Sequence, residues 1–308
     1  MANTFITPTV IAARGIATLY NTIVLAGLVW RDFDADFTGA QGDTVNVRKP
    51  AVLASSLFDQ TARTTTYQDA TESSVALNLD KLRHVPFYVT DEQMTLEISD
   101  FQQQLLDPAM QTLAQDIDGD LAEGLVDAAE GGSGGGTVNI TDDPATTDTA
   151  NYVLRKAREI LQRKKMPVLN RYAVLSPEAE TVTLGDVVFL TAQNAGTTDA
   201  LREAIVGRAF GMDTYGSQAF GFGPGDMGQA DGIAFHQSAM ILATRPLDQP
   251  RGVPDGLISR ADLNGLSLRV IYSYDHDAKK DKITVDILYG LLAARPEGVV
   301  QLNFGQGS

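Results

Sequence analysis

Two alternating segments near the C-terminus constrain the fold of this 308-residue chain more than any other feature. In each segment every second residue is apolar, and a polar loop at 275–281 separates the two. This period of two is typical of half-buried β-strands, and two such strands joined by a polar loop predict an antiparallel hairpin. The residues that share one face are Leu266, Leu268, Val270 and Tyr272 in the first segment and Ile283, Val285, Ile287 and Tyr289 in the second.

The residues that follow this hairpin carry a resemblance to a known family. The second segment ends in Asp-Ile-Leu-Tyr-Gly at 286–290, and an Arg-Pro-Glu at 295–297 precedes a last apolar strand that ends near 302. This order resembles the C-terminal end of the major capsid proteins of tailed bacteriophages, which have the HK97-like fold. Residues 208–217 resemble the segment of these capsid proteins in which a helix gives way to a strand that contains several glycines. Residues 232–243 resemble the strand just after it.

The resemblance implies an α+β chain with the HK97-like capsid fold, and it implies roles for five segments. The N-terminal arm and the extended β-hairpin loop would lie over neighbouring subunits, and the axial domain would gather around five- and six-fold centres. The segments are an N-terminal arm at 1–43, an extended loop hairpin at 44–90, a peripheral domain with a long spine helix at 91–150, an axial domain at 151–260 and a return to the peripheral-domain sheet at 261–308.

The first predicted helix begins with Thr7 as its N-cap and Pro8 as its first helical residue, and apolar residues at helical spacing extend it to about Trp30. The residues that follow, 31–42, are rich in Asp and Gly and offer little surface to pack against. The resemblance makes this helix the N-terminal arm, which would lie along a neighbouring subunit. The alternative is a helix tucked onto its own domain.

The strongest predicted helix opens at Asp107 and Pro108 and closes at Gly131. Its apolar residues recur at steps of three and four, and about 23 residues at ~1.5 Å each give a rod of roughly 35 Å. The resemblance makes this rod the spine helix. A second helix is predicted around 153–161, a short strand at 172–175 and a short helix at 201–206.

Residues 44–90 are predicted to form a long hairpin, with strands at 44–50 and 74–90. The middle, 51–73, consists mainly of Thr, Ser, Ala, Gln and Asp, which is too little apolar content for a core. An isolated two-stranded hairpin is marginally stable and needs an outside surface. In the resembled family that surface is an adjacent subunit.

The net charge of −15 is distributed unevenly along the chain. Residues 85–154 contain fourteen carboxylates and no Lys or Arg, whereas residues 155–171 contain seven Lys and Arg. A run of like charge is usually a solvated face. Two functional interpretations stay open beside it, an acidic wall that repels packaged DNA and opposed patches that favour contacts between copies.

The composition excludes several classes of protein. A chain with 44% hydrophobic residues can bury a substantial core, and the absence of Cys excludes disulfides and thiolate metal sites. The longest uncharged run of the first helix, 15–30, is shorter than the ~20 apolar residues that span a bilayer. No signal-peptide pattern is present. We therefore expect cytosolic synthesis and no membrane contact.

No motif in the sequence supports catalysis or cofactor binding. His84, His236 and His276 are far apart and lack metal-ligand spacing. The Asp-His-Asp at 275–277 could hold a cation, but the lysines beside it favour a solvated turn. Residues 223–228 have the spacing of a dinucleotide-binding turn, yet a strand follows them where that turn needs a helix. We therefore assign no catalytic, cofactor-binding or metal-binding residue and no cofactor.

The resemblance thus implies a non-enzymatic major capsid protein of the virion that self-assembles into an icosahedral shell around double-stranded DNA and matures from a procapsid. Hexamers and pentamers of the chain, a portal and a decoration protein are expected partners. A separate scaffolding protein is expected as well, because the chain begins only a few residues before its first helix. Assembly is expected in the host cytoplasm. The alternatives are an encapsulin-type compartment with protein cargo and a hydrolase that uses the Asp and His residues near 276.

Overall fold

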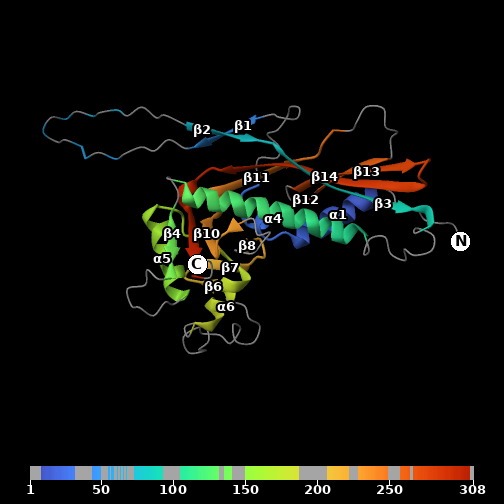
Figure 1. The fold of residues 1–308 in the computed structure, drawn as a ribbon. Helices are drawn as coiled ribbons and strands as arrows, with labels where there is room; N and C mark the ends of the chain where they lie inside the picture. The colour runs from blue at the N-terminus through green and yellow to red at the C-terminus, as the bar shows by residue number, and fades with distance from the viewer. Residues whose placement is uncertain are drawn as a thin grey trace.

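The secondary structure combines helices with mainly antiparallel sheets, which confirms the predicted α+β class. Helix α4 (Asp107–Glu130) lies along one side of a long sheet, and the strands β1 and β2 lie on the other side (Figure 1). The computed structural model describes residues 8–31, 44–49, 73–92, 105–131, 135–140, 150–186, 207–221, 228–248, 257–263 and 266–305, and single positions between 55 and 67.

A five-stranded antiparallel sheet forms the long part of the body. The hairpin predicted near the C-terminus is confirmed as β13 and β14, in which Asp275 lies opposite Lys280 and Arg269 lies opposite Asp286. Strand β14 is central, because β3 and β11 also pair with it. The strands are β3 (Lys81–Thr90), β11 (Met240–Arg245), β12 (Ile258–Leu263), β13 (Leu266–Asp275) and β14 (Lys280–Ala293).

One face of this sheet packs on α4 and on the N-terminal helix α1 (Pro8–Thr22). The alternating residues of β13 and β14 supply the sheet side of this core, and Leu113 on α4 and Val285 on β14 are completely buried. Each buried aliphatic side chain of this size stabilises the fold by ~1.5–3 kcal/mol. The prediction for α4 is confirmed, with Pro108 in its first turn and Gly131 after its last.

The N-terminal helix differs from its prediction. It ends at Thr22, and a separate short helix, α2 (Leu25–Leu28), follows it. Ile11 and Leu19 are buried in the same core as α4, so the expected packing along a neighbouring subunit is wrong for residues 8–31. The physical reason is that one side of the five-stranded sheet extends beyond α4, and α1 covers β12 and β13 there.

The segment predicted as one strand at 74–90 consists of two strands in different sheets. Strand β1 (Thr44–Lys49) pairs with β2 (Ser73–Asn78), whereas β3 begins at Lys81 and pairs with β14. Residues 79–80 between them belong to neither strand. Most of the polar middle of this predicted hairpin lies outside the described residues.

A six-stranded sheet lies at one end of α4 (Figure 1). The last strand, β15 (Val299–Asn303), belongs to this sheet, so the segment 266–302 is divided between two sheets and does not form a single one. The strand predicted at 232–243 is divided in the same way, because a 3₁₀ turn at 237–239 redirects the chain. In order across the sheet the strands are β4 (Thr137–Asn139), β15, β10 (Gly232–His236), β5 (Arg171–Leu175), β7 (Met212–Gly216) and β6 (Arg208–Ala209).

Helix α5 (Ala150–Arg163) packs on this second sheet, which confirms the helix predicted around 153–161, and β5 confirms the strand predicted at 172–175. The helix predicted at 201–206 lies outside the described residues. The domain boundaries stay predictions. The remaining elements are α6 (Pro177–Gly185), β8 (Phe220–Gly221), β9 (Gly228–Gln229), η4 (Gln237–Ala239) and η5 (Pro296–Gly298).

Candidate functional site

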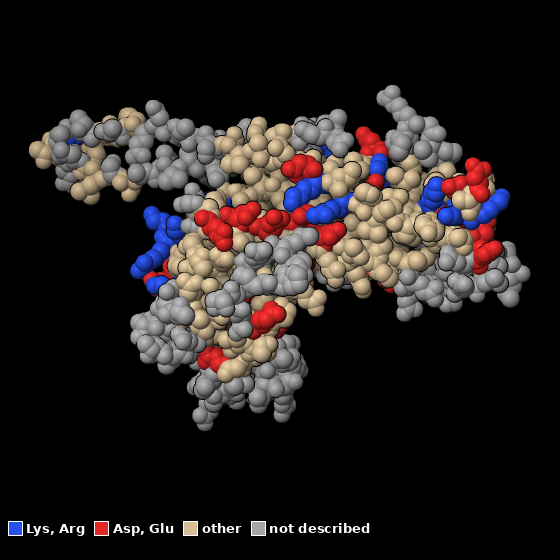
Figure 2. Space-filling model, viewed as in Figure 1, with Lys and Arg blue, Asp and Glu red and all other residues tan. Residues whose placement is uncertain are grey.

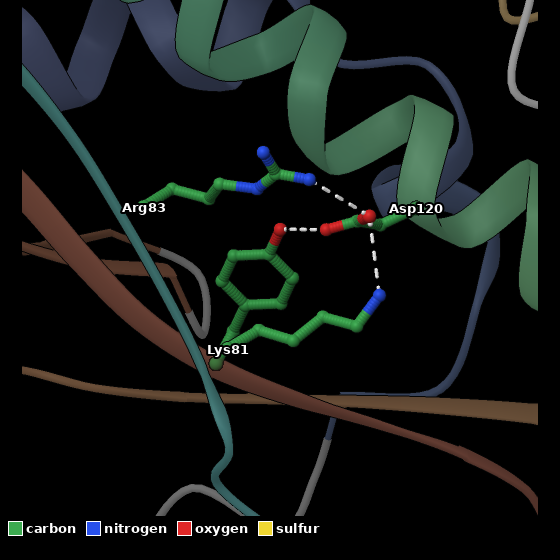
Figure 3. Close-up of polar contacts among 4 residues, drawn as sticks. Lys81, Arg83 and Asp120 are labelled. Carbon is green, nitrogen blue, oxygen red and sulfur yellow. Dashed lines mark hydrogen bonds and ion pairs between the residues drawn. The ribbon is translucent and has the colours of Figure 1, made fainter.

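A buried carboxylate anchors the strand that follows the hairpin to the long helix (Figure 3). The side chain of Asp120, on α4, is 4% exposed. The Lys81 Nζ lies 3.1 Å and the Arg83 Nη2 lies 3.0 Å from Asp120 Oδ1, and the Tyr289 hydroxyl donates a hydrogen bond to Asp120 Oδ2. The cluster therefore ties β3 and β14 to α4.

The alternation of β3 explains how both cations reach the helix. Lys81, Arg83, Val85 and Phe87 are partly buried, and the residues between them are exposed. Since alternate side chains of a strand share one face, the two cations and the two apolar residues lie on the side of the sheet that faces α4. β3 thus begins with a polar anchor and continues as part of the core.

Burial raises the pKa of Asp120, but the hydrogen bonds from Tyr289, Arg83 and Lys81 outweigh burial and hold that pKa below its ordinary value. The hydrogen bond to Asp120 raises the pKa of Arg83 in turn. Asp120 is therefore ionised at neutral pH. Removing the Asp120 charge takes a charged acceptor from the buried Tyr289 hydroxyl and from two partly exposed cations, which is costly.

A glycine in β14 permits the strand β2 to cross close above the sheet. A Cβ on Gly290 would overlap the backbone carbonyl oxygen of Asn78, the last residue of β2. Leu77 and Leu79 on either side of Asn78 pack against Leu288 on the same face of the sheet. The direction in which the hairpin leaves the body is thus set by a backbone contact that only glycine allows.

The far part of the hairpin presents apolar side chains to solvent. Leu57 is 100% exposed, Tyr67 is 90% exposed and Phe58 is 53% exposed. Strand β1, in contrast, contributes the buried Val47 to a core cluster. Exposed apolar groups of this size mark an interaction surface.

A second buried carboxylate holds the segment between α1 and α2. Asp118 Oδ2 accepts a hydrogen bond from the Val24 N–H at 2.8 Å, and Oδ1 accepts from the Leu25 and Ala26 N–H groups at 3.0 and 3.2 Å. Burial raises the pKa of Asp118 to about 6, although the three N–H groups lower it. Trp30 then joins the edge of β11, because its N–H bonds to the Met240 carbonyl at 3.1 Å.

The charged surfaces of α4 and α5 are separate. Figure 2 shows a row of carboxylates along α4 and a basic group at the edge of the molecule. We name Glu123, Asp127 and Glu130 the acidic stripe, and all three are exposed. Among the described residues no ion pair joins the acidic stripe to a base. The basic group belongs to the α5 region, where Lys156 and Arg163 both pair with Glu159.

The structure does not bring the three histidines together. His84 is exposed on β3 and His276 is exposed in the β13–β14 turn. His236 is buried on β10, where its Nδ1 accepts a hydrogen bond from the Ser238 N–H at 3.1 Å. Burial lowers the pKa of His236, and nearby Arg171 and Arg295 lower it further.

The Asp-His-Asp sequence forms a self-contained turn. Asp275 Oδ1 accepts hydrogen bonds from the Asp277 and Ala278 N–H groups at 3.1 and 3.2 Å, and Oδ2 pairs with Lys282 at 2.7 Å. Lys282 and these N–H groups lower the pKa of Asp275 to about 2. Within the described part of the chain no cluster of His, Asp and Glu is placed to hold a metal ion, and no helix is long and apolar enough to span a bilayer. Most of the glycine-rich segment 223–228 lies outside that part.

The fold is that of the HK97-like capsid proteins, since solved phage capsids match nearly the whole chain. A structure of Mycobacterium phage Che8 matches with a TM-score of 0.69 at 21% identity, over 93% of this chain and 92% of that chain. The capsid structure of Cyanophage P-SCSP1u matches with a TM-score of 0.63 at 14% identity, over 98% of this chain and 90% of that chain. A virus-like particle from Pyrococcus furiosus matches with a TM-score of 0.55 at 10% identity, over 95% of this chain and 97% of that chain.

The sequence model of the phage capsid protein family matches residues 86–302, which is well over half of the chain. The chain therefore belongs to the phage capsid protein family, and it is a major capsid protein that forms the shell of the virion. No curated protein matches it.

Sequence reasoning missed the roles of Asp118 and Asp120, which it counted only as members of an acidic block. Both are more than nine-tenths buried. Helical spacing contained the signal, because Asp118 lies four residues after Ala114 and Asp120 lies three after Ile117, and both of those residues are in the core. A carboxylate at a core position of a helix predicts a buried polar partner.

Proposed function

We propose that this capsid protein assembles as hexamers and pentamers into an icosahedral shell that encloses the double-stranded DNA genome of a tailed phage. Membership of the phage capsid protein family carries the proposal. The exposed Leu57, Phe58 and Tyr67 support it, because a projecting hairpin with apolar side chains in water gains stability when a neighbouring copy covers them.

The proposed contact with the genome is enclosure without sequence-specific binding. Tight DNA binding needs several Lys or Arg side chains that neutralise phosphates. The chain carries the opposite charge overall, and its net charge of −15 repels phosphates.

We further propose a separate scaffolding protein, a portal and a decoration protein as partners, assembly in the host cytoplasm and maturation from a procapsid. The protein acts as a structural component and performs no chemical reaction in this proposal. The five segments with boundaries at 43, 90, 150 and 260 are its proposed division into arm, hairpin loop, peripheral domain, axial domain and the return to the peripheral-domain sheet.

Sedimentation and electron microscopy of the purified protein test the proposal. We expect megadalton particles with icosahedral outlines, alone or with phage scaffolding protein, and nuclease-protected DNA in particles from infected cells. Particles that contain protein cargo and no DNA would instead support the encapsulin-type alternative. A protein that stays monomeric under all of these conditions would contradict shell formation.

A further inference from the structure

The connection between α5 and β5 forms an ordered knob on the surface. We name residues 163–170 the basic turn. It contains Arg163, Lys164 and Lys165, and its tip exposes Val168 by 52% and Leu169 by 71%. The two apolar side chains at the tip therefore contribute little to a core of their own chain.

The conformation of the basic turn is set from inside the protein. The side chain of Arg171 is almost fully buried, and its Nε and Nη2 donate hydrogen bonds of 2.7 Å to the carbonyl oxygens of Pro167 and Met166. Lys165 has a φ of 57° and Asn170 a φ of 55°, and the Gln237 N–H bonds to the Asn170 carbonyl at 3.0 Å. A surface that is already ordered loses little conformational entropy on binding.

The cations of the basic turn have few partners within the chain. Arg163 pairs with Glu159, but no ion pair involves Lys164 or Lys165 among the described residues. Both lysines are exposed. The turn therefore offers two unpaired cations beside two apolar side chains, which favours a partner that combines carboxylates with an apolar or neutral surface.

The acidic stripe has the matching composition. Glu123, Asp127 and Glu130 are the only exposed side chains of α4 between Ile117 and Glu130, so no lysine or arginine is interspersed. Their spacing of four and three residues places like charges side by side, and the last turn of α4 contains no basic residue to offset the helix dipole. The repulsion between these charges thus destabilises α4, and a cationic partner would offset that repulsion.

We propose that the basic turn of one subunit docks on the acidic stripe of α4 in a second copy of this chain. The two surfaces carry opposite charge, and among the described residues no ion pair joins them within one subunit. Contact between two different patches is head-to-tail, which closes into rings when the rotation between copies permits. The inference rests on shell formation, and it names one contact that holds neighbouring subunits together. The apolar tip favours a protein partner over nucleic acid.

Crosslinking tests this contact cleanly, because the chain contains no native cysteine. In shells of the variant Leu169→Cys/Asp127→Cys, a short bismaleimide is expected to produce a ladder of covalent multimers on a denaturing gel. Each single variant is expected to give monomers only, and so is the control pair Leu169→Cys/Asp277→Cys. Intact shells of the double variant without a ladder overturn the proposal, and so does a link within one chain. Absence of shells from the wild-type protein would instead count against the proposed function.

Charge reversal provides a second readout, which applies even if the cysteine variants do not assemble. We expect Lys164→Glu/Lys165→Glu to weaken subunit association about tenfold at low salt, with partial recovery at high salt. Adding Glu123→Lys/Asp127→Lys to that variant is expected to restore association, with unchanged thermal unfolding of the isolated subunit. No recovery in the combined variant overturns the proposal. The proposal would also be overturned if the wild-type subunit bound duplex DNA tightly and Lys164→Glu/Lys165→Glu abolished that binding.

Discussion

Asp118 and Asp120 lie two residues apart on α4 and are both buried, yet the pKa of Asp118 is raised and that of Asp120 is lowered. Burial acts on both carboxylates in the same direction. The difference comes from their partners, since Asp118 faces three backbone N–H groups and Asp120 faces two cations and a tyrosine hydroxyl. The two residues therefore give the subunit opposite responses to pH.

Asp118 is expected to make the folded subunit less stable as the pH rises from about 4 to about 6. Its pKa of about 6 exceeds the ordinary value, so the folded state binds more protons than the unfolded state in this window. The linked loss is about 3 kcal/mol, since one pKa unit is worth about 1.4 kcal/mol. Denaturant unfolding of Asp118→Asn and wild type at several pH values measures it. An identical pH slope in both proteins would contradict this assignment.

Asp120→Asn is expected to destabilise the subunit by about 1–3 kcal/mol at pH 7, because the buried Tyr289 hydroxyl and the partly exposed Lys81 and Arg83 lose their shared charged acceptor. A lowered pKa means that Asp120 contributes stability above the ordinary carboxylate pKa and loses it as the pH falls through its own. The penalty of the substitution is therefore expected to shrink in acid. Asp127→Asn, at an exposed position of the same helix, is the matched control, and we expect it to change stability by less than about 0.5 kcal/mol.

Gly290→Ala is expected to destabilise the subunit by about 3 kcal/mol or to displace the β1–β2 hairpin, because a Cβ overlaps the backbone of Asn78. Gly27→Ala is the control, since no atom lies within 4 Å of a Cβ built there. Thermal melts of both variants and electron microscopy of their assemblies provide the measurement. Equal stability of the two variants would show that β2 does not cross β14 this closely.

Leu19→Ala is expected to destabilise the isolated subunit by about 2–5 kcal/mol, because Leu19 is completely buried in the core shared with α4. Ala17→Ser, at an exposed position of α1, is expected to be nearly neutral. Removal of residues 1–30 is accordingly expected to abolish cooperative unfolding of the subunit. A truncated subunit that keeps the wild-type melt and fails only in assembly would restore the neighbouring-subunit interpretation of this helix.

Deletion of residues 53–67 is expected to leave a folded subunit that assembles poorly. The exposed Leu57, Phe58 and Tyr67 lie in this segment, and they contribute nothing to the core of a single chain. Circular dichroism reports the folding of the deletion variant and sedimentation reports its assembly. Closed shells at normal yield would show that the hairpin does not clamp neighbouring subunits.

Local sequence patterns were sufficient to predict elements whose conformation depends mainly on their own residues. The period of two in 266–289 predicted β13 and β14, and the caps and apolar spacing of α4 predicted both of its ends within a residue. The same patterns did not reveal where 74–90 and 232–243 divide. When one extended segment contributes to two sheets, its residues are apolar on both sides of the division. Strand propensity therefore does not indicate where the division lies.

The sequence by itself determined the class of fold, the long helix and the C-terminal hairpin, because periodicity and capping are local properties of the chain. Only the tertiary structure decided which carboxylates of the acidic block are buried anchors and which remain in the acidic stripe. It also decided that α1 belongs to its own subunit. These outcomes depend on what each side chain meets across the fold, since burial and opposite charge act between residues such as Asp120 and Arg83 that are distant in sequence.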